Sequence, residues 1–493
     1  MSNRAIAGST LWQVASQTVM AMLSIVTVKF VAIGLSKELA GNYHSAYGFL
    51  QLFGILADFG LYAVAVREVS AAPDRSEDHD VPDRSQVMGA LIILRTLILA
   101  ASLGLALTLV WMLPAWQGTP LPLGVTVASL VPLFTLLAGI QRTVFQVRHQ
   151  MHYVFIAEVT QRVVTVVLIG LFILMGTRLS EDEQVYRAFL FIGGIGAFVL
   201  FVLSTSFARK LMRVRLEWDW QLLRSLLLRS APYGIAFFCT ALYRQLDVTL
   251  IALLRPDFEV QNAYYGFALR IVEMAFLFPT FLLNSTLPTL AERHARKEDT
   301  RIFLGKTLFA ILLLSTTAFL FAFFWARPVM MLLTTDDYLA TALRPGSDTA
   351  LRLLALPMFL NGIVLFSFYA LLTRHAWQPL VTTLALGALF SLGLNLMLIP
   401  RYGFVGAGWT SIATHLFLAS ALFPQSLRMM PLTLPRRLLL QWGLYTLLLA
   451  TFLALTAPHL TSTPKTVVGS IFALLVIAGI VVGMRIPRSL GMK

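Results

Sequence analysis

Apolar runs of about twenty residues recur along the whole 493-residue chain, and they constrain its fold more than any other feature. As an α-helix, a run of this length crosses about 30 Å of hydrocarbon. The runs do not alternate with period two, which argues against the short strands of a membrane β-barrel. The chain is 58% hydrophobic and 13% charged, with a mean hydropathy of +0.77. These values predict an all-α protein that crosses a membrane many times.

We expect about fourteen membrane-spanning helices. They cover residues 9–33, 41–66, 87–113, 121–141, 154–176, 187–208, 231–254, 262–290, 303–326, 349–372, 377–399, 404–426, 438–457 and 466–484. Lys and Arg are concentrated at the two termini and in every second connection between them. The positive-inside rule then places both termini in the cytoplasm, for a multi-pass protein of the cytoplasmic (inner) membrane.

An internal repeat predicts how these spans are grouped. A shift of 218 positions aligns Tyr47-Gly48-Phe49 with Tyr265-Gly266-Phe267, and both triplets lie near the start of an even-numbered span. The pattern indicates a duplicated six-span unit. A basic segment with two tryptophans separates the copies and is predicted to be an amphipathic helix on the cytoplasmic surface, with a plain basic connector as the alternative for its first half. The expected domains are an N-terminal six-helix lobe (1–208), the linker (209–230), a C-terminal six-helix lobe (231–426) and two additional helices (427–493).

Several predicted spans carry ionisable residues, which cost roughly 2.5 to 3.5 kcal/mol each near the bilayer centre. Arg244 with Asp247 and Arg270 with Glu273 are three apart, and Glu158 with Arg162 are four apart, so each pair shares one helix face. The remaining members are Lys29, Asp58 and Arg95. Two interpretations are open: the pairs join helices as structural ion pairs, or they line a polar cavity inside the membrane.

Other functional classes find little support. The net charge of +14 follows from the loop bias, and no basic stripe with interleaved aromatic residues indicates nucleic-acid binding. Cys239 is the only cysteine, and no His or Cys spacing predicts a metal site. Asp58-Phe59-Gly60 matches a kinase triplet without its companion motifs. His415 is expected to be a core histidine bonded to a neighbour. We therefore expect no catalytic residues, no metal and no cofactor, and a protein that is not an enzyme.

Four stretches resemble a known family. They are LADFGLYAVAVREVS at 56–70, LLRSAPYGIAFFCTALYRQLD at 227–247, NAYYGFALRIVEM at 262–274 and NLMLIPRYGFVGAGWTSIATH at 395–415. With them the chain is similar to the polysaccharide flippases of the multidrug/oligosaccharidyl-lipid/polysaccharide exporter superfamily. The fourteen-span count is similar to that of the lipid II flippase branch. The resemblance implies two six-helix bundles related by a pseudo-twofold axis and working by alternating access.

The resemblance also implies a substrate and site residues. The substrate is a polyprenyl-diphosphate-linked oligosaccharide, and cavity arginines of this superfamily meet the diphosphate. By position, Lys29, Arg244 and Arg270 are the best candidates, with Arg162 and Arg95 nearer the cytoplasmic entrance. Asp247, Glu273, Asp58 and Glu158 would pair with them or bind a coupling cation, a proton or sodium. Expected partners are membrane lipids and glycan-assembly enzymes, around a monomer.

Two alternatives stay open. A cation-coupled multidrug exporter of the same fold would have a cavity rich in acids and aromatic residues, whereas cations outnumber acids by one inside these spans. A membrane glycan polymerase or ligase would carry a large outward loop, and the predicted spans leave room for none. Both alternatives explain the sequence less well than a flippase.

Overall fold

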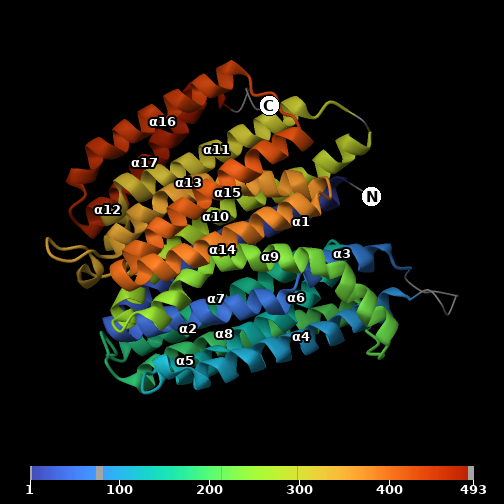
Figure 1. The fold of residues 1–493 in the computed structure, drawn as a ribbon, viewed down its shortest axis with the longest axis horizontal. Coiled ribbons are helices and arrows are strands. Elements are labelled where there is room, and N and C mark those ends of the chain that lie inside the picture. Colours follow the sequence, from blue (N-terminus) through green and yellow to red (C-terminus); the bar gives the residue numbers. More distant parts are fainter. Residues whose placement is uncertain (1–2, 74–81, 213, 297, 487–493) are drawn as a thin grey trace. The chain divides into compact units, whose positions relative to one another are not determined.

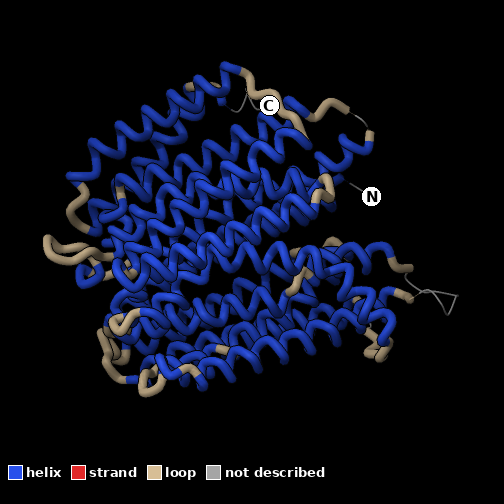
Figure 2. Tube along the Cα trace, in the orientation of Figure 1, coloured by secondary structure: helices blue, strands red, loops and turns tan. Residues whose placement is uncertain are grey.

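The computed structural model describes residues 3–73, 82–212, 214–296 and 298–486. Every regular element among them is a helix, apart from one bridge between Leu35 and Ser180 (Figure 2). The helices are α1 (Asn3–Gly34), α2 (Lys37–Asp58), α3 (Leu61–Ala71), α4 (Arg84–Met112), η1 (Pro114–Trp116), α5 (Leu121–Ala128), α6 (Leu130–Val147), α7 (His152–Leu174), α8 (Glu183–Leu211), α9 (Trp220–Leu254), α10 (Phe258–Ala295), α11 (Arg301–Phe324), α12 (Ala326–Leu333), η2 (Asp336–Tyr338), α13 (Ser347–Thr373), α14 (Trp377–Tyr402), α15 (Phe404–Met429), α16 (Arg436–Thr456), η3 (Ala457–His459) and α17 (Thr463–Gly483).

Twelve helical segments of the described chain are long and apolar enough to cross a membrane, with α5 and α6 counted as one. They correspond in order to the last twelve predicted spans. The first two predicted spans correspond to α1, whose described apolar part is Val19–Gly34, and to α2 with α3. The prediction of an all-α, multi-pass membrane protein with about fourteen spans is confirmed.

The second predicted span, 41–66, is wrong as a single helix. α2 ends at Asp58, and the next two residues adopt the left-handed conformation, with φ of 41° at Phe59 and 68° at Gly60. A Cβ at Gly60 would lie 2.5 Å from the Cβ of Tyr233 in α9, so only glycine fits this contact. The chain therefore breaks here and restarts as α3.

The basic segment 209–230 also differs from the predicted separate amphipathic helix. Its first three residues complete α8, and its residues from Trp220 onward begin α9. Asp219 caps this start, because its Oδ1 accepts hydrogen bonds from the main-chain N–H groups of Gln221 (2.9 Å) and Leu222 (3.1 Å). The second half of the predicted linker is thus an extension of a 35-residue membrane helix.

Contacts divide the chain into two compact units, Met1–Asn262 and Ala263–Lys493. In the first unit, α9 packs along α2, α3 and α4, while α1 packs on α7, and α6 packs on α8 (Figure 1). In the second unit, α13 packs on α11 and α15, and α14 packs on α15. The predicted lobes follow the sequence repeat, whereas the contacts group α9 with the helices that precede it.

Asn42 and Glu259 show how the end of the first unit is attached to α2. The Asn42 side-chain amide donates to Glu259 Oε1 at 2.8 Å. The Asn262 side chain bonds to the Ser45 hydroxyl (2.8 Å) and to a main-chain carbonyl of α9 (2.9 Å). A Cβ at Gly41 would lie 1.6 Å from the Glu259 carbonyl oxygen, so the main chains are in direct contact. These contacts join α2 to the α9–α10 connection.

The predicted repeat has a structural counterpart in the two Tyr-Gly-Phe triplets. In the first unit, the Phe49 ring meets Trp116 edge-on, with centroids 5.2 Å apart and an interplanar angle of 83°. In the second unit, Phe267 meets Tyr338 in the same way, at 4.9 Å and 78°. Each partner lies in the connection that follows the third span of its half.

A second repeated contact involves the segment that follows the sixth span of each half. Arg215 donates its main-chain N–H to the first turn of α4 at 3.4 Å, and Thr433 donates to the first turn of α11 at 3.1 Å. A Cβ at Gly89 of α4 would lie 1.8 Å from the Arg215 carbonyl oxygen, and one at Gly305 of α11 would lie 2.0 Å from that of Thr433. The two halves therefore repeat in detail as well as in order.

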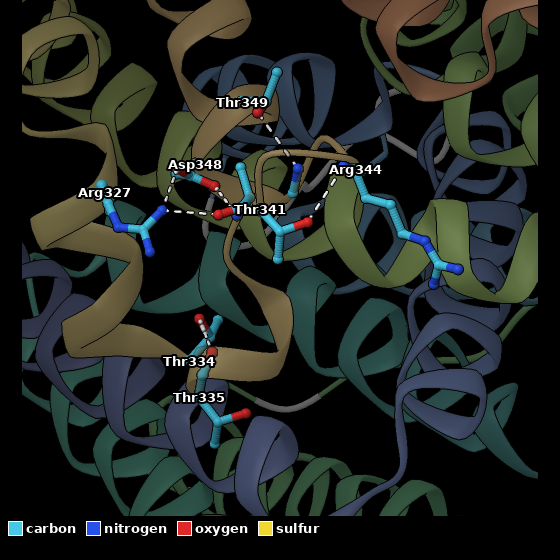
Figure 3. A network of polar contacts seen from close by, with 9 residues as sticks. Arg327, Thr334, Thr335, Thr341, Arg344, Asp348 and Thr349 are labelled. Atoms are coloured by element: carbon cyan, nitrogen blue, oxygen red, sulfur yellow. Dashed lines mark hydrogen bonds and ion pairs between the residues drawn. The ribbon is translucent and has the colours of Figure 1, made fainter.

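The connection between α12 and α13 is held by a polar network in the second unit (Figure 3). Arg327 donates to the Ala340 carbonyl at 2.8 Å and lies 3.7 Å from Asp348 Oδ2. Asp348 Oδ1 accepts from the Ala340 N–H at 2.7 Å. Thr341 and Arg344 add a main-chain turn at 2.9 Å. Because Asp348 is buried, this network fixes the connection to the start of α13.

Candidate functional site

Seven of the nine predicted site residues lie in the first unit, and Arg270 and Glu273 lie in the second. The first unit also holds a cavity of about 300 Å³ between α1, α6, α7 and α8. The structure brings Glu158 and Arg162 together in this cavity. Arg95 pairs with Asp58 outside the set of cavity residues.

Arg95 is a structural anchor. Its side chain is 3% exposed and its Nη1 bonds both to the Asp58 side chain and to the Asp58 carbonyl oxygen. Its Nε donates to the Leu136 carbonyl oxygen of α6 at 3.2 Å. One guanidinium on α4 therefore joins the end of α2 to α6. This geometry favours the ion-pair interpretation for Arg95 and Asp58.

Arg270 and Glu273 pair with each other within α10. Arg270 Nη1 lies 2.9 Å from Glu273 Oε2, and both side chains are partly exposed. The three-residue spacing predicted from the sequence thus forms a local ion pair. Neither side chain is fully enclosed by protein, with 29% of Arg270 and 21% of Glu273 exposed.

Lys29, Arg244 and Asp247 occupy α1 and α9. Asp247 is buried, while Lys29 and Arg244 are half-buried. Asp247 precedes Val248, the residue that packs on Gly48 of α2. The buried carboxylate therefore lies next to the α2–α9 contact.

The cavity in the first unit is polar on two of its helices. Glu158, Gln161 and Arg162 of α7 share one face, because they are three and four residues apart. Arg142 of α6 lies opposite and bonds through Nη1 to Glu158 Oε1 at 3.1 Å. Met20, Ala138, Phe145, Val154 and Leu200 supply apolar lining. Thr135 and Ser204 add hydroxyl groups.

Arg142 is a cavity residue that the sequence interpretation missed. The predicted span ended at residue 141, which assigned Arg142 to a cytoplasmic loop, but α6 continues to Val147. The signal lay in the sequence after the apolar run: Gln141, Arg142 and Gln146 interrupt a helical pattern that still places Val144 and Phe145 in the core. Polar residues on one side of a continuing apolar helix indicate a cavity, not a loop.

His415 confirms the expectation of a core histidine. It is 2% exposed, and its Nδ1 lies 2.8 Å from the Ser411 carbonyl oxygen one helical turn earlier. Within the described ranges no group of three His, Cys, Asp or Glu side chains is arranged to hold a metal ion.

Twelve helical segments able to cross a membrane, joined by short connections in the described chain, define the class as a polytopic membrane protein. The family model "Polysaccharide biosynthesis protein" matches residues 6–292, more than half of the 493 residues. The chain therefore belongs to this family, as the sequence resemblance predicted. No curated protein sequence matches the chain.

Solved structures share the fold at low sequence identity. A lipid II flippase, MurJ, in its inward closed conformation has a TM-score of 0.71 at 13% identity, covering 98% of this chain and 99% of that one. An inward-facing multidrug resistance MATE transporter of the MOP superfamily has a TM-score of 0.61 at 11% identity, covering 85% and 98%. The MATE multidrug transporter DinF-BH, solved as a complex, has a TM-score of 0.61 at 14% identity, covering 88% and 98%.

Proposed function

We propose that this protein is a flippase that moves a polyprenyl-diphosphate-linked oligosaccharide across the cytoplasmic membrane, with both termini in the cytoplasm. The observation that carries the proposal is the cavity inside the first unit, which gathers two guanidinium groups and one carboxylate among its lining residues, in a chain of the polysaccharide biosynthesis family. A surplus of guanidinium suits a phosphate ligand, because its planar fork of donors matches phosphate oxygens.

The physical requirement of the reaction explains such a design. Sugar and diphosphate need a polar route, because hydrocarbon offers no hydrogen bonds to them. The prenyl chain is as apolar as lipid and can stay in the bilayer while the headgroup crosses. A transporter that exposes its polar interior to one side at a time meets both conditions without chemical change in the substrate. The protein is then not an enzyme and uses no cofactor.

In this proposal, Arg244, Arg270 and Lys29 contact the diphosphate, and Arg162 lies nearer its entrance. Asp247 and Glu273 neutralise the arginines while the route is empty or take up a coupling cation, a proton or sodium. The Arg270–Glu273 pair at 2.9 Å supports this arrangement, because a phosphate can replace the carboxylate on an arginine. Arg95 holds helices together and is left out of the binding set.

Proteoliposomes test the proposal. A fluorescent polyprenyl-diphosphate oligosaccharide in the inner leaflet should reach an external glycosidase only when the protein is present. Arg244→Ala and Arg270→Ala should each slow this step about tenfold or more, because each removes charge-assisted hydrogen bonds. Flipping at the wild-type rate by both variants would remove these residues from the site. Efflux of cationic drugs without glycan transfer would support the multidrug exporter instead, and lengthening of the glycan would support a polymerase.

A further inference from the structure

A second cavity, of about 570 Å³, lies in the second unit where α13 and α15 end and α14 begins. α13 packs on α15, and α14 packs on α15 as well (Figure 1). The lining residues Gln378, Thr382 and Arg428 are exposed, so the cavity opens to the surface of the unit. Its volume falls within the range of small-molecule sites.

The cavity presents one cation and no carboxylate. Arg428 of α15 is the ionisable residue among its described lining residues. The shortage of acids extends through the sequence around it, because Asp348 is the last acidic residue of the chain and ten Lys and Arg residues follow it. The cavity therefore supplies no counter-ion of its own for Arg428.

Gln425 places an unused acceptor beside this cation. Its side-chain amide donates to the Thr383 hydroxyl of α14 at 3.2 Å. Its Oε1 is buried and accepts no hydrogen bond from any described residue. Gln425 and Arg428 are three residues apart on α15, so they share one helix face. A ligand that brings both a negative charge and a hydrogen-bond donor would satisfy both groups.

The surface that continues from the cavity is apolar. On α14, the exposed lining residues Gln378 and Thr382 are followed at helical spacing by Leu386 and Leu389, which are also exposed. The neighbouring α15 adds exposed Leu416. A polar end that continues into an apolar face matches the shape of an amphiphile, with one headgroup and its acyl chains.

The length of α14 places the cavity at the depth of the lipid headgroups. Its 26 residues extend about 39 Å, whereas the hydrocarbon core is about 30 Å thick. Trp377, the first residue of α14, is of the type that concentrates at membrane interfaces. The lining residues of α14 belong to its first two turns. They therefore meet the phosphate layer of the bilayer, and the apolar face meets the acyl chains.

We propose that this cavity binds the headgroup of an anionic, hydroxyl-bearing bilayer phospholipid of the phosphatidylglycerol class. Arg428 donates to the phosphate, a headgroup hydroxyl donates to Gln425 Oε1, and the acyl chains lie along Leu386 and Leu389. Phosphatidylcholine fits less well, because it has no donor for Gln425 and Arg428 repels its ammonium group. The ligand is a component of the bilayer and not the cargo, so the inference stands apart from the proposed function.

Native mass spectrometry of the full-length protein in detergent tests the ligand. The probes are phosphatidylglycerol, phosphatidylcholine and phosphatidylmethanol with the same acyl chains, and soluble glycerol 3-phosphate. Phosphatidylglycerol should bind about tenfold or more tighter than phosphatidylcholine and glycerol 3-phosphate. Phosphatidylmethanol keeps the charge but lacks the hydroxyl, so it should bind about threefold or more weaker than phosphatidylglycerol.

Variants of the lining residues test the place. Arg428→Gln should weaken phosphatidylglycerol binding about tenfold, and Arg428→Lys should fall between this variant and wild type. Thr382→Trp fills the open cavity and should prevent binding. Arg437→Gln is the matched control, because Arg437 is exposed at the start of α16, outside the lining residues, and its loss changes the net charge equally. Melting temperatures without added lipid should be the same for all four variants.

Several outcomes would overturn the inference. Wild-type affinity in both Arg428→Gln and Thr382→Trp would place the lipid elsewhere, and equal binding of phosphatidylcholine would remove the anion selectivity. Glycerol 3-phosphate bound as tightly as phosphatidylglycerol would indicate a soluble ligand. Equal binding of phosphatidylmethanol would remove Gln425 from the site. Displacement of phosphatidylglycerol by an equal amount of geranylgeranyl diphosphate would assign the cavity to the cargo.

The assay is independent of the flipping assay. The lining residues of this cavity have no part in the proposed substrate route, so failure of lipid binding leaves the proposed function standing. Specific phosphatidylglycerol binding in a protein that transfers no glycan lipid in proteoliposomes would keep the lipid site and reject the flippase.

Discussion

At the scale of single residues, the arginines inside this protein have different roles despite equal charge. Arg95 donates hydrogen bonds to protein oxygens of α2 and α6. Arg270 pairs locally along α10, and Arg142 lines a cavity and bonds to Glu158. Burial and the number of protein acceptors therefore mark Arg95 as the structural arginine of the three.

Removing Arg95 should destabilise the protein without acting on a substrate. Arg95→Met leaves Asp58 without its cation, and loss of one partner from a buried pair costs roughly 3 kcal/mol. Because Asp58 is 31% exposed, solvent should reduce this value somewhat. The double variant Arg95→Met/Asp58→Asn should recover part of the loss. Thermal melting in detergent checks both, with Arg187→Met as the surface control. A full loss that the double variant does not reduce would contradict pairing as the cause.

At the scale of elements, the break between α2 and α3 shows how a glycine sets a helix boundary inside a membrane bundle. Phe59 and Gly60 both have positive φ, and the gap they make receives the main chain of α9 beside Tyr233 and Gly234. Pro232 lies in the same part of α9 and removes one main-chain donor there. The break between α2 and α3 therefore faces the part of α9 that contains Pro232.

Gly60→Ala should be disruptive, because alanine is strained at this φ and its Cβ would lie 2.5 Å from the Cβ of Tyr233. We expect a loss of roughly 1 to 3 kcal/mol. Gly104→Ala is the matched control, since a Cβ there meets nothing within 4 Å and helix propensity should make it neutral or stabilising. Melting temperatures of the two variants give the comparison. Equal stability would show that the break tolerates a side chain and that the backbone there can relax.

Sequence patterns predicted the helices much better than their contacts. Apolar length alone located the last twelve spans, because a bilayer imposes the same requirement on each helix. The second span is not one helix and the second half of the linker is not a separate one, since hydropathy does not detect a left-handed pair such as Phe59-Gly60, or a cap such as Asp219. The cavity could not be predicted as a whole: Glu158 and Arg162 share a face by spacing, but their approach to Arg142 depends on how α6 packs on α7 and α8.

At the scale of the whole molecule, the repeat explains why contacts and sequence divide the chain differently. In each copy, the third span packs against the first helix that follows that copy. The buried Trp116 after α4 donates its indole N–H to the Ala252 carbonyl of α9 at 2.8 Å. The buried Trp325 after α11 donates to the Leu453 carbonyl of α16 at 3.0 Å. Trp116 also packs edge-on against Phe49. In the second copy, Tyr338 makes the corresponding contact, with Phe267.

The repeat predicts matched effects at two distant glycines. Gly89→Ala and Gly305→Ala each push a methyl group into a main-chain carbonyl at 1.8 and 2.0 Å, so each should lower stability by a similar amount, roughly 1 to 3 kcal/mol. Gly443→Ala, where a Cβ meets nothing within 4 Å, should not. Melting curves of the three variants decide. A large effect at only one of the two positions would mean that the two main-chain contacts are not equivalent.

The hydrogen bond of Trp325 relates the two helices after the second copy to the internal repeat. The segment before α16 bonds to the first turn of α11, just as the segment before α9 bonds to the first turn of α4. Like α9, α16 accepts a hydrogen bond from the indole N–H of a tryptophan. α16 thus stands where a third copy would begin, and α17 follows as its second helix. A duplication of this kind provides the packing surface for its own extension, because the third span of each copy packs against the first helix that follows that copy.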